Sequence, residues 1–269
     1  MLEQVTFLLL AVLLLAVVFD YINGFHDTAN AIATSVSTRA LKPEQAILLS
    51  AAANFLGALT GTAVAKTIAS GIATTPDGDA GQIIVAAALV GGITWNLITW
   101  RLGIPSSSSH ALIGGLIGAV IASSGTQALN TKGIVDKVII PLVSSPIAGV
   151  GIGFLVMVVL LNVFRRSSPR RINEQFRRLQ ILSASFMAFS HGSNDAQKTM
   201  GIMTLALVSA GILKTAEVPL YVILIAATAI SLGTMAGGWR IIKTMGQRVV
   251  KLDPRSEEHT SELQSLAYL

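Results

Sequence analysis

Seven long stretches of this chain contain no Asp, Glu, Lys or Arg, and they restrict its possible folds more than any other feature. A helix needs about 20 apolar residues to cross the core of a bilayer, and most of the stretches are long enough. Only 12% of the residues are charged, whereas a soluble domain carries roughly a quarter. The stretches are Val5–Phe19, Gln45–Ala65, Ala80–Trp100, Leu102–Thr131, Val138–Phe164, Thr199–Leu213 and Val218–Trp239.

The composition favours membrane-spanning helices over a membrane β-barrel. The chain has 9 Phe, 3 Trp and 3 Tyr, too few for the aromatic girdles of a barrel. It has no cysteine, which excludes disulfides and thiolate metal sites. The stretch Val5–Phe19 has no basic residue before it, so we interpret it as a retained span and not as a signal peptide. We predict an all-α, polytopic membrane protein that contacts the lipid bilayer.

The basic residues predict how the chain is oriented in the membrane. Six arginines lie within 165–178, opposed only by Glu174, and a second basic group lies within 240–251. Short loops rich in Lys and Arg face the cytoplasm, so we place both there, together with Arg39 and Lys42. The segments 74–79 and 214–218, and the N-terminus, then lie outside. This pattern also explains the net charge of +5 without a nucleic-acid partner.

Two segments do not read as simple spans. Residues 5–38 would measure about 50 Å as one helix, and polar residues around Gly24 lie at their centre. We expect a helix broken at Gly24, or a span followed by a re-entrant half-helix. Residues 102–131 are interrupted by Gly103, Pro105 and four serines. Broken helices at membrane depth are tolerated where they line a cavity enclosed by protein.

Three polar clusters lie inside the apolar surroundings, at 23–30, 105–110 and 190–198. The first and third share the pattern Gly-x-x-Asp, which ends at Asp27 and at Asp195. In the predicted topology, Asp27 lies on a segment that runs inward and Asp195 on one that runs outward. We therefore predict an inverted repeat. In many secondary transporters the substrate site lies where two such halves meet.

The two acids are expensive in this setting, because an ionised carboxylate in a membrane helix costs about 2.5–3.5 kcal/mol or more. Asp195 has Lys198 three residues later as a partner. For Asp27 we count no base before Arg39, so we expect it to hold a bound cation or a proton. The alternative is that each acid is only paired with a neighbouring base or with water at a helix end.

The serines Ser106, Ser107, Ser108 and Ser109 are the natural counterpart for an anion. If Pro105 begins a half-helix, the free backbone N–H groups, the hydroxyls and the positive end of the helix dipole point at one position. Such a site suits a tetrahedral oxyanion. The alternative is that the serines only cap and pack the helix. His110 is either a proton carrier or a packing donor, and His26 and His191 are open in the same way.

Ser, His and Asp inside the membrane are also the ingredients of nucleophilic catalysis. However, the sequence has no Gly-x-Ser-x-Gly elbow, and four adjacent serines single out no nucleophile. We therefore expect a carrier of a tetrahedral oxyanion, such as sulfate or phosphate, and not an enzyme.

The runs Gly24-Phe-His-Asp27-Thr-Ala-Asn30, Pro105-Ser-Ser-Ser-Ser-His110 and Ser190-His-Gly-Ser-Asn-Asp195 resemble the inorganic phosphate transporter (Pit) family. The resemblance covers nearly the whole chain up to about residue 253. It implies cation-coupled phosphate uptake, an inverted-repeat fold, a homodimer and a place in the cell (inner) membrane. By motif position, Asp27, Asn30 and Asp195 would be the cation and coupling groups. The anion would be surrounded by Ser106–Ser109 with Thr28, Asn194 and Gln197.

One residue departs from the sodium-coupled branch of that family. The position three after the acid is Asn30 in the first copy but Lys198 in the second. An ammonium there would take the place of a sodium ion and add positive charge beside a phosphate. The pattern resembles the bacterial proton-coupled branch, which carries phosphate or a neutral metal–phosphate complex. We therefore expect a proton as the coupling ion, with Na⁺ or a divalent metal as alternatives, and no other cofactor.

The spacing of the motifs predicts where the second copy continues. Ser106 follows Asp27 by 79 residues, and the same spacing after Asp195 reaches position 274, beyond the last residue. Residues 255–269 are polar and resemble the translation of a sequencing-library adapter, so we expect a non-native tail. We divide the rest into a first repeat (1–164), a cytoplasmic basic loop (165–178) and an incomplete second repeat (179–254), which we do not expect to transport alone.

Overall fold

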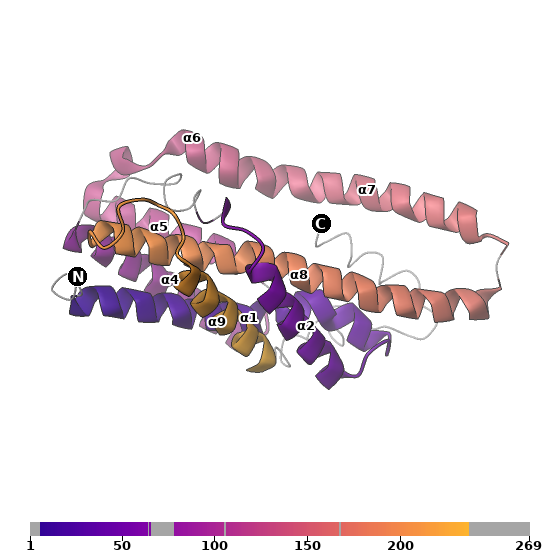
Figure 1. The fold of residues 1–269 in the computed structure, drawn as a ribbon. Helices are drawn as coiled ribbons and strands as arrows, with labels where there is room; N and C mark the ends of the chain where they lie inside the picture. Colours follow the sequence, from indigo (N-terminus) through magenta and orange to yellow (C-terminus); the bar gives the residue numbers. More distant parts are fainter. Residues whose placement is uncertain (1–5, 64, 66–77, 105, 167, 237–269) are drawn as a thin grey trace.

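The computed structural model describes residues 6–63, 65, 78–104, 106–166 and 168–236, and all regular elements in this part of the chain are helical (Figure 1). The elements are α1 (Phe7–Ser37), α2 (Pro43–Ala58), α4 (Asp79–Leu102), α5 (Ser108–Ser124), η2 (Thr126–Ala128), α6 (Thr131–Ile134), η3 (Val135–Ile139), α7 (Ile140–Phe164), α8 (Pro169–Ser209) and α9 (Leu220–Ala236).

The helix break that we expect at Gly24 does not exist. Helix α1 runs unbroken for 31 residues, from the N-cap Thr6 to the C-cap Thr38. The third polar cluster likewise lies inside the unbroken 41-residue α8. Several polar side chains of these clusters bond to other helices, so the backbone has no local reason to unwind.

The second interruption is confirmed. Helix α4 ends at Gly103, whose φ of 69° is the left-handed conformation that glycine adopts without steric strain. Helix α5 begins at Ser108, with Ser107 as N-cap accepting a hydrogen bond from the His110 backbone N–H at 3.3 Å. Pro105 lies outside the described residues. The helix thus starts within the serine run and not before it.

Four glycines bring two pairs of antiparallel helices into close contact. A Cβ at Gly24 of α1 would lie 2.2 Å from the Ile230 carbonyl oxygen of α9, and one at Gly233 would lie 2.0 Å from that of Tyr21. Helices α2 and α8 repeat this arrangement. There, a Cβ at Gly192 would lie 2.1 Å from the backbone carbonyl oxygen of Asn54, and one at Gly57 would lie 2.0 Å from that of Phe189. Small residues at helix crossings are typical of membrane proteins, since they let backbones approach closely.

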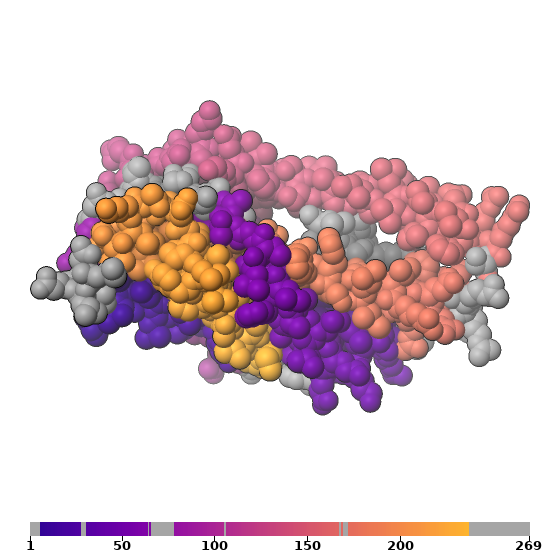
Figure 2. All heavy atoms as spheres, viewed as in Figure 1, coloured from indigo at the N-terminus to yellow at the C-terminus, as the bar shows by residue number. Residues whose placement is uncertain are grey.

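Three described helical segments are long and apolar enough to cross a membrane: Phe7–Ser37, Asp79–Leu102 and Thr131–Phe164. Two shorter apolar helices, α5 and α9, accompany them. Only 6% of the apolar window within Thr131–Phe164 is buried, and α7 stands apart from α8 over much of its length (Figure 2). An apolar surface of this extent requires lipid or protein to cover it, which agrees with the predicted polytopic membrane fold.

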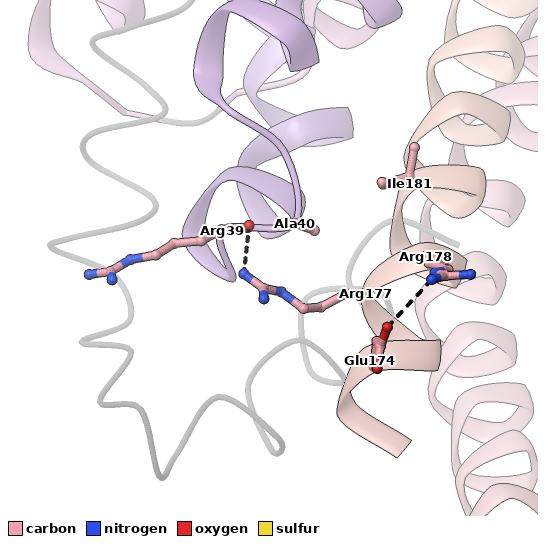
Figure 3. Close-up of a pocket in the computed structure, with 6 residues that line it drawn as sticks. All are labelled: Arg39, Ala40, Glu174, Arg177, Arg178 and Ile181. Atoms are coloured by element: carbon pink, nitrogen blue, oxygen red, sulfur yellow. Dashed lines mark hydrogen bonds and ion pairs between the residues drawn. The ribbon is translucent and has the colours of Figure 1, made fainter. Parts of the chain in front are cut away.

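Two of the segments that we predict to be cytoplasmic meet at one end of the bundle. The Arg177 Nη2 donates a hydrogen bond of 2.8 Å to the Arg39 carbonyl oxygen, and the Arg178 guanidinium lies 3.4 Å from Glu174 (Figure 3). These residues line a pocket of about 300 Å³. The segment 165–178 is not a loop over most of its length, because α8 begins at Pro169. The described arginine side chains of this segment, Arg165, Arg166, Arg177 and Arg178, are exposed.

Candidate functional site

The candidate site lies where α1 and α8 cross in opposite directions. The Asn23 amide of α1 donates a 3.3 Å hydrogen bond from Nδ2 to Oδ2 of Asp195 on α8. Asp27 and Asp195 are both buried, at 7% and 8% exposure. Asp27, His191 and Asp195 each offer one ligand atom within 4.8 Å of the others. The two acids that the sequence singles out therefore share one polar site.

On the α1 side, Asp27 has a base as its immediate neighbour, contrary to our expectation. His26 Nδ1 lies 2.8 Å from Asp27 Oδ1, and His26 Nε2 lies 3.0 Å from the Thr99 hydroxyl of α4. The Ser108 hydroxyl of α5 lies 2.6 Å from both Asp27 Oδ2 and Asn23 Oδ1. The premise that no base precedes Arg39 is therefore wrong, because a histidine can turn its ring toward the adjacent side chain, and the cation or proton on Asp27 stays a prediction.

On the α8 side, Lys198 is the partner of Asp195, a pairing that the sequence offers as the alternative to a functional role. Its Nζ contacts Asp195 Oδ1 and also the Ser109 hydroxyl of α5. His191 Nε2 lies 3.3 Å from Asp195 Oδ2 without the alignment of a hydrogen bond. Its Nδ1 lies 3.1 Å from Asn54 Oδ1, and the Asn54 amide donates at 2.8 Å to Thr234. A chain of polar contacts therefore extends from the acids through α2 to α9.

The four serines do not converge on one position, which corrects the predicted anion nest. Ser106 donates to Thr99 at 3.1 Å, Ser107 caps α5, Ser108 contacts Asn23 and Asp27, and Ser109 contacts Lys198. The reason is the late start of α5: only residues at and after the N-cap share its helical geometry. The serines are thus divided between the helix end and the two acids.

The remaining predicted site residues fall into three groups. His110 and Asn194 are exposed, and the Asn194 amide bonds to the Ser190 carbonyl of its own helix at 2.9 Å. The structure does not bring these two into the cluster. Gln197 is buried at 4% exposure and faces Gly61, since a Cβ there would lie 3.3 Å from Gln197 Nε2. Thr28 and Asn30 lie on α1, but their side chains are outside the described part of the structure.

Several residues that connect the site were left without a role by the sequence. Asn23 lies in the first cluster, and it links Ser108 to Asp195. Thr99 and Asn54 belong to apolar stretches and carry no motif, so only the packing of the helices identifies them. His191 was an open candidate, and its position beside Asp195 was detectable, since residues four apart share one helix face.

This arrangement suits a small charged solute. Two carboxylates, an ammonium, two imidazoles and several hydroxyls meet inside an apolar helical bundle, on helices that cross in opposite directions. Ionisable groups buried in membrane helices characterise ion and substrate pathways. The fold and the site together define a polytopic α-helical membrane transporter.

Comparison with known proteins identifies the family. The chain belongs to the phosphate transporter family, whose model matches residues 23–172 and 162–256. It is 50% identical over 248 residues to a probable low-affinity inorganic phosphate transporter of Bacillus subtilis, covering 92% of this chain and 74% of that protein. A protein of the same description from Mycobacterium tuberculosis is 49% identical over 253 residues, covering 92% of this chain and 60% of that protein. Membership of this family identifies the chain as a transporter and not an enzyme. The hypothesis of an intramembrane hydrolase is therefore excluded.

A solved structure has the same fold. It is described as a sodium-dependent phosphate transporter, with a TM-score of 0.75 and 22% sequence identity, and the match covers 97% of this chain and 84% of that one. The shared fold confirms that the all-α, polytopic membrane architecture predicted from the apolar stretches is correct.

Proposed function

We propose that this chain forms the larger part of a carrier that takes up inorganic phosphate across the cell (inner) membrane together with a cation, and that this cation is a proton. The single observation that carries the choice of cation is the position of Lys198. Its ammonium contacts Asp195 and Ser109, so a fixed positive charge occupies the place where a coupling Na⁺ would meet that carboxylate. A proton binds to a carboxylate oxygen and does not need the space that a sodium ion would occupy.

Phosphate would bind between the serine run and the α8 cluster. Lys198 and Ser109 already contact each other there, and on binding both would turn to the anion. Charge-assisted hydrogen bonds from an ammonium and hydroxyls suit phosphate oxygens. A neutral metal–phosphate complex is the alternative form of substrate, with Asp27 and Asp195 nearest the metal.

The inverted repeat is supported by the reciprocal glycine contacts. Tyr21, Gly24 and Asp27 each have a counterpart 168 positions later, at Phe189, Gly192 and Asp195. Asn54 and Gly57 of α2 have counterparts 176 positions later in α9, at Ile230 and Gly233. The first helix of each half packs on the second helix of the other half. We propose that this exchange places the substrate between the halves, and that two carriers form a homodimer, as the family resemblance implies.

Uptake of labelled phosphate by proteoliposomes tests the function and the coupling ion together. The assay uses this chain and a hybrid in which it replaces the matched region of the Bacillus subtilis relative. An inward pH gradient is expected to drive accumulation in the hybrid, whereas a sodium gradient without pH gradient or voltage is not. Uptake driven by sodium alone would refute proton coupling, and uptake in neither preparation under any gradient would refute the function.

Competition by other oxyanions tests the substrate class. Arsenate carries a proton near neutral pH, as phosphate does, and sulfate does not. A carboxylate that accepts a hydrogen bond from the substrate would favour the protonated anions. We expect excess arsenate to suppress labelled phosphate uptake and excess sulfate to leave it unchanged. Equal suppression by both would indicate a general oxyanion carrier.

A further inference from the structure

Asp20 is a buried acid that the proposed phosphate site does not use. It lies on α1 seven residues before Asp27 and three before Asn23, so it shares their face of the helix. Its exposure is 0%, and neither carboxyl oxygen has a hydrogen-bond partner within the described part of the chain. The Thr199 hydroxyl and the Asn23 amide lie beside it, and Asp195 and Lys198 act on it electrostatically.

Two further unpartnered polar side chains lie in the surrounding packing. Thr199 is buried at 0% exposure, and its hydroxyl has no partner among the described residues. Asn96 of α4 is also fully buried, and neither its Nδ2 nor its Oδ1 has a hydrogen-bond partner among the described residues. Gly92 faces Phe19 and Thr99 contacts His26, so Asn96, which lies between them on α4, faces α1 at the level of Asn23.

We propose that Asp20 is a second proton-binding site of this carrier, protonated in the conformation described here. In an apolar interior, an ionised carboxylate whose oxygens accept no hydrogen bond from the described residues is far less favourable than the neutral acid. A sodium ion would need several oxygen ligands around a cavity, whereas a proton occupies no additional space. This inference rests on the proposed cation-coupled function, which it extends by a site outside the two motifs.

The position of Asp20 connects its protonation to the phosphate site. When the proton leaves a carboxyl oxygen of Asp20 for water, a negative charge remains near Lys198, which otherwise contacts Asp195 and Ser109. Asp195 and Lys198, both on α8, are charged groups that act on Asp20. Loss of the proton would therefore draw Lys198 away from Asp195 and Ser109 and change the site that holds the anion.

Infrared spectroscopy of the reconstituted chain tests the protonation directly. A neutral carboxylic acid has a carbonyl band separate from that of a carboxylate, and at neutral pH we expect the wild-type band to lose intensity in Asp20→Asn. The matched control is Asp79→Asn, an exposed acid at the start of α4, which should leave the band unchanged. An identical band in wild type and Asp20→Asn would overturn the proposal, and so would disappearance of the Asp20 band when Na⁺ is added.

Transport by the hybrid tests the coupling role. Asp20→Asn should lower pH-driven accumulation about tenfold or more, within the range of coupling between linked sites, while phosphate counterflow without net proton movement stays close to wild type. Asp20→Glu, which keeps a titratable group, should restore part of the accumulation. Normal accumulation in Asp20→Asn, or equal loss of counterflow, would overturn the proposal. If wild type shows no uptake, the proposed function fails, and the infrared result still decides the state of Asp20.

Discussion

Asn23 on α1 donates a hydrogen bond to Asp195 on α8 across 172 positions of sequence. Through this bond and the contact of Ser108 with Asn23 and Asp27, the two acids of the proposed repeats join one network. Removal of one partner leaves a buried polar group unsatisfied, which costs about 1–3 kcal/mol and more for a charged group.

Lys198→Asn should change the coupling ion. The substitution removes the ammonium from Asp195 and introduces the residue type that the first copy has three positions after its acid, at Asn30. Phosphate uptake by the hybrid is then expected to respond to a sodium gradient. The measurement is the initial rate of uptake at fixed pH with and without Na⁺. Lys198→Arg, which keeps the positive charge, is the control and should remain independent of Na⁺. Sodium independence in Lys198→Asn would contradict the ammonium's role.

Ser108→Ala should lower phosphate uptake more than Ser107→Ala. Ser108 is 1% exposed and contacts both Asp27 and Asn23, whereas Ser107 caps α5. Loss of an N-cap costs about 0.5–2 kcal/mol of stability and should mainly lower the melting temperature. The comparison uses initial rates and thermal unfolding in detergent, with the exposed Ser124→Ala as control. A larger loss of uptake in Ser107→Ala would favour a backbone anion site at the helix start.

Thr99→Val should reduce uptake through the orientation of His26. The Thr99 hydroxyl contacts His26 Nε2 and accepts a hydrogen bond from Ser106. Its loss leaves the buried His26 ring and the half-buried Ser106 hydroxyl without this partner, so we expect a decrease in stability of about 1–3 kcal/mol. Thr94→Val is the matched control, because that exposed hydroxyl donates to the Val90 carbonyl of its own helix and contacts no other polar group among the described residues. Equal thermal stability of the two variants would argue against the His26–Thr99 contact.

Gly192→Ala should destabilise the packing of α8 on α2. The added Cβ would lie 2.1 Å from the Asn54 oxygen and 2.5 Å from its Cα, so the helices must separate. Overpacking of this kind costs about 1–3 kcal/mol, which thermal unfolding in detergent would detect. Gly114→Ala on α5 is the control, since its Cβ meets nothing within 4 Å. It should be neutral or slightly stabilising, because alanine favours helix over glycine. Unchanged unfolding in Gly192→Ala would show that this crossing is not close.

Single cysteines should report the orientation of the chain, because the protein has none of its own. Arg39→Cys and Glu174→Cys lie at the end of the bundle where the basic segments meet, and we expect both to react only when a thiol reagent reaches the cytoplasmic side. Lys214→Cys should react with an impermeant reagent from outside. Labelling in intact cells and inverted vesicles makes the comparison. Arg39 and Glu174 sites that react from opposite sides would contradict the predicted topology.

The class of the protein was readable from local features of the sequence. Long apolar stretches and an excess of arginine between them are properties of short segments, and bilayer thickness translates them into spans. The two motif acids and the pairing of Asp195 with Lys198 were also accessible, because partners three residues apart share a helix face.

Only the tertiary structure decided which groups share the site. The glycines at 24 and 192 leave room for a neighbouring backbone and do not break their helices. The partners of Asn23 and His191 lie on other helices, and Asp20 has no hydrogen-bond partner within the described part of the chain. A hydrogen bond forms wherever packing brings a donor and an acceptor within about 3 Å, irrespective of their separation in sequence. Sequence periodicity assigns a residue to a helix face, but the crossing of helices determines what that face meets.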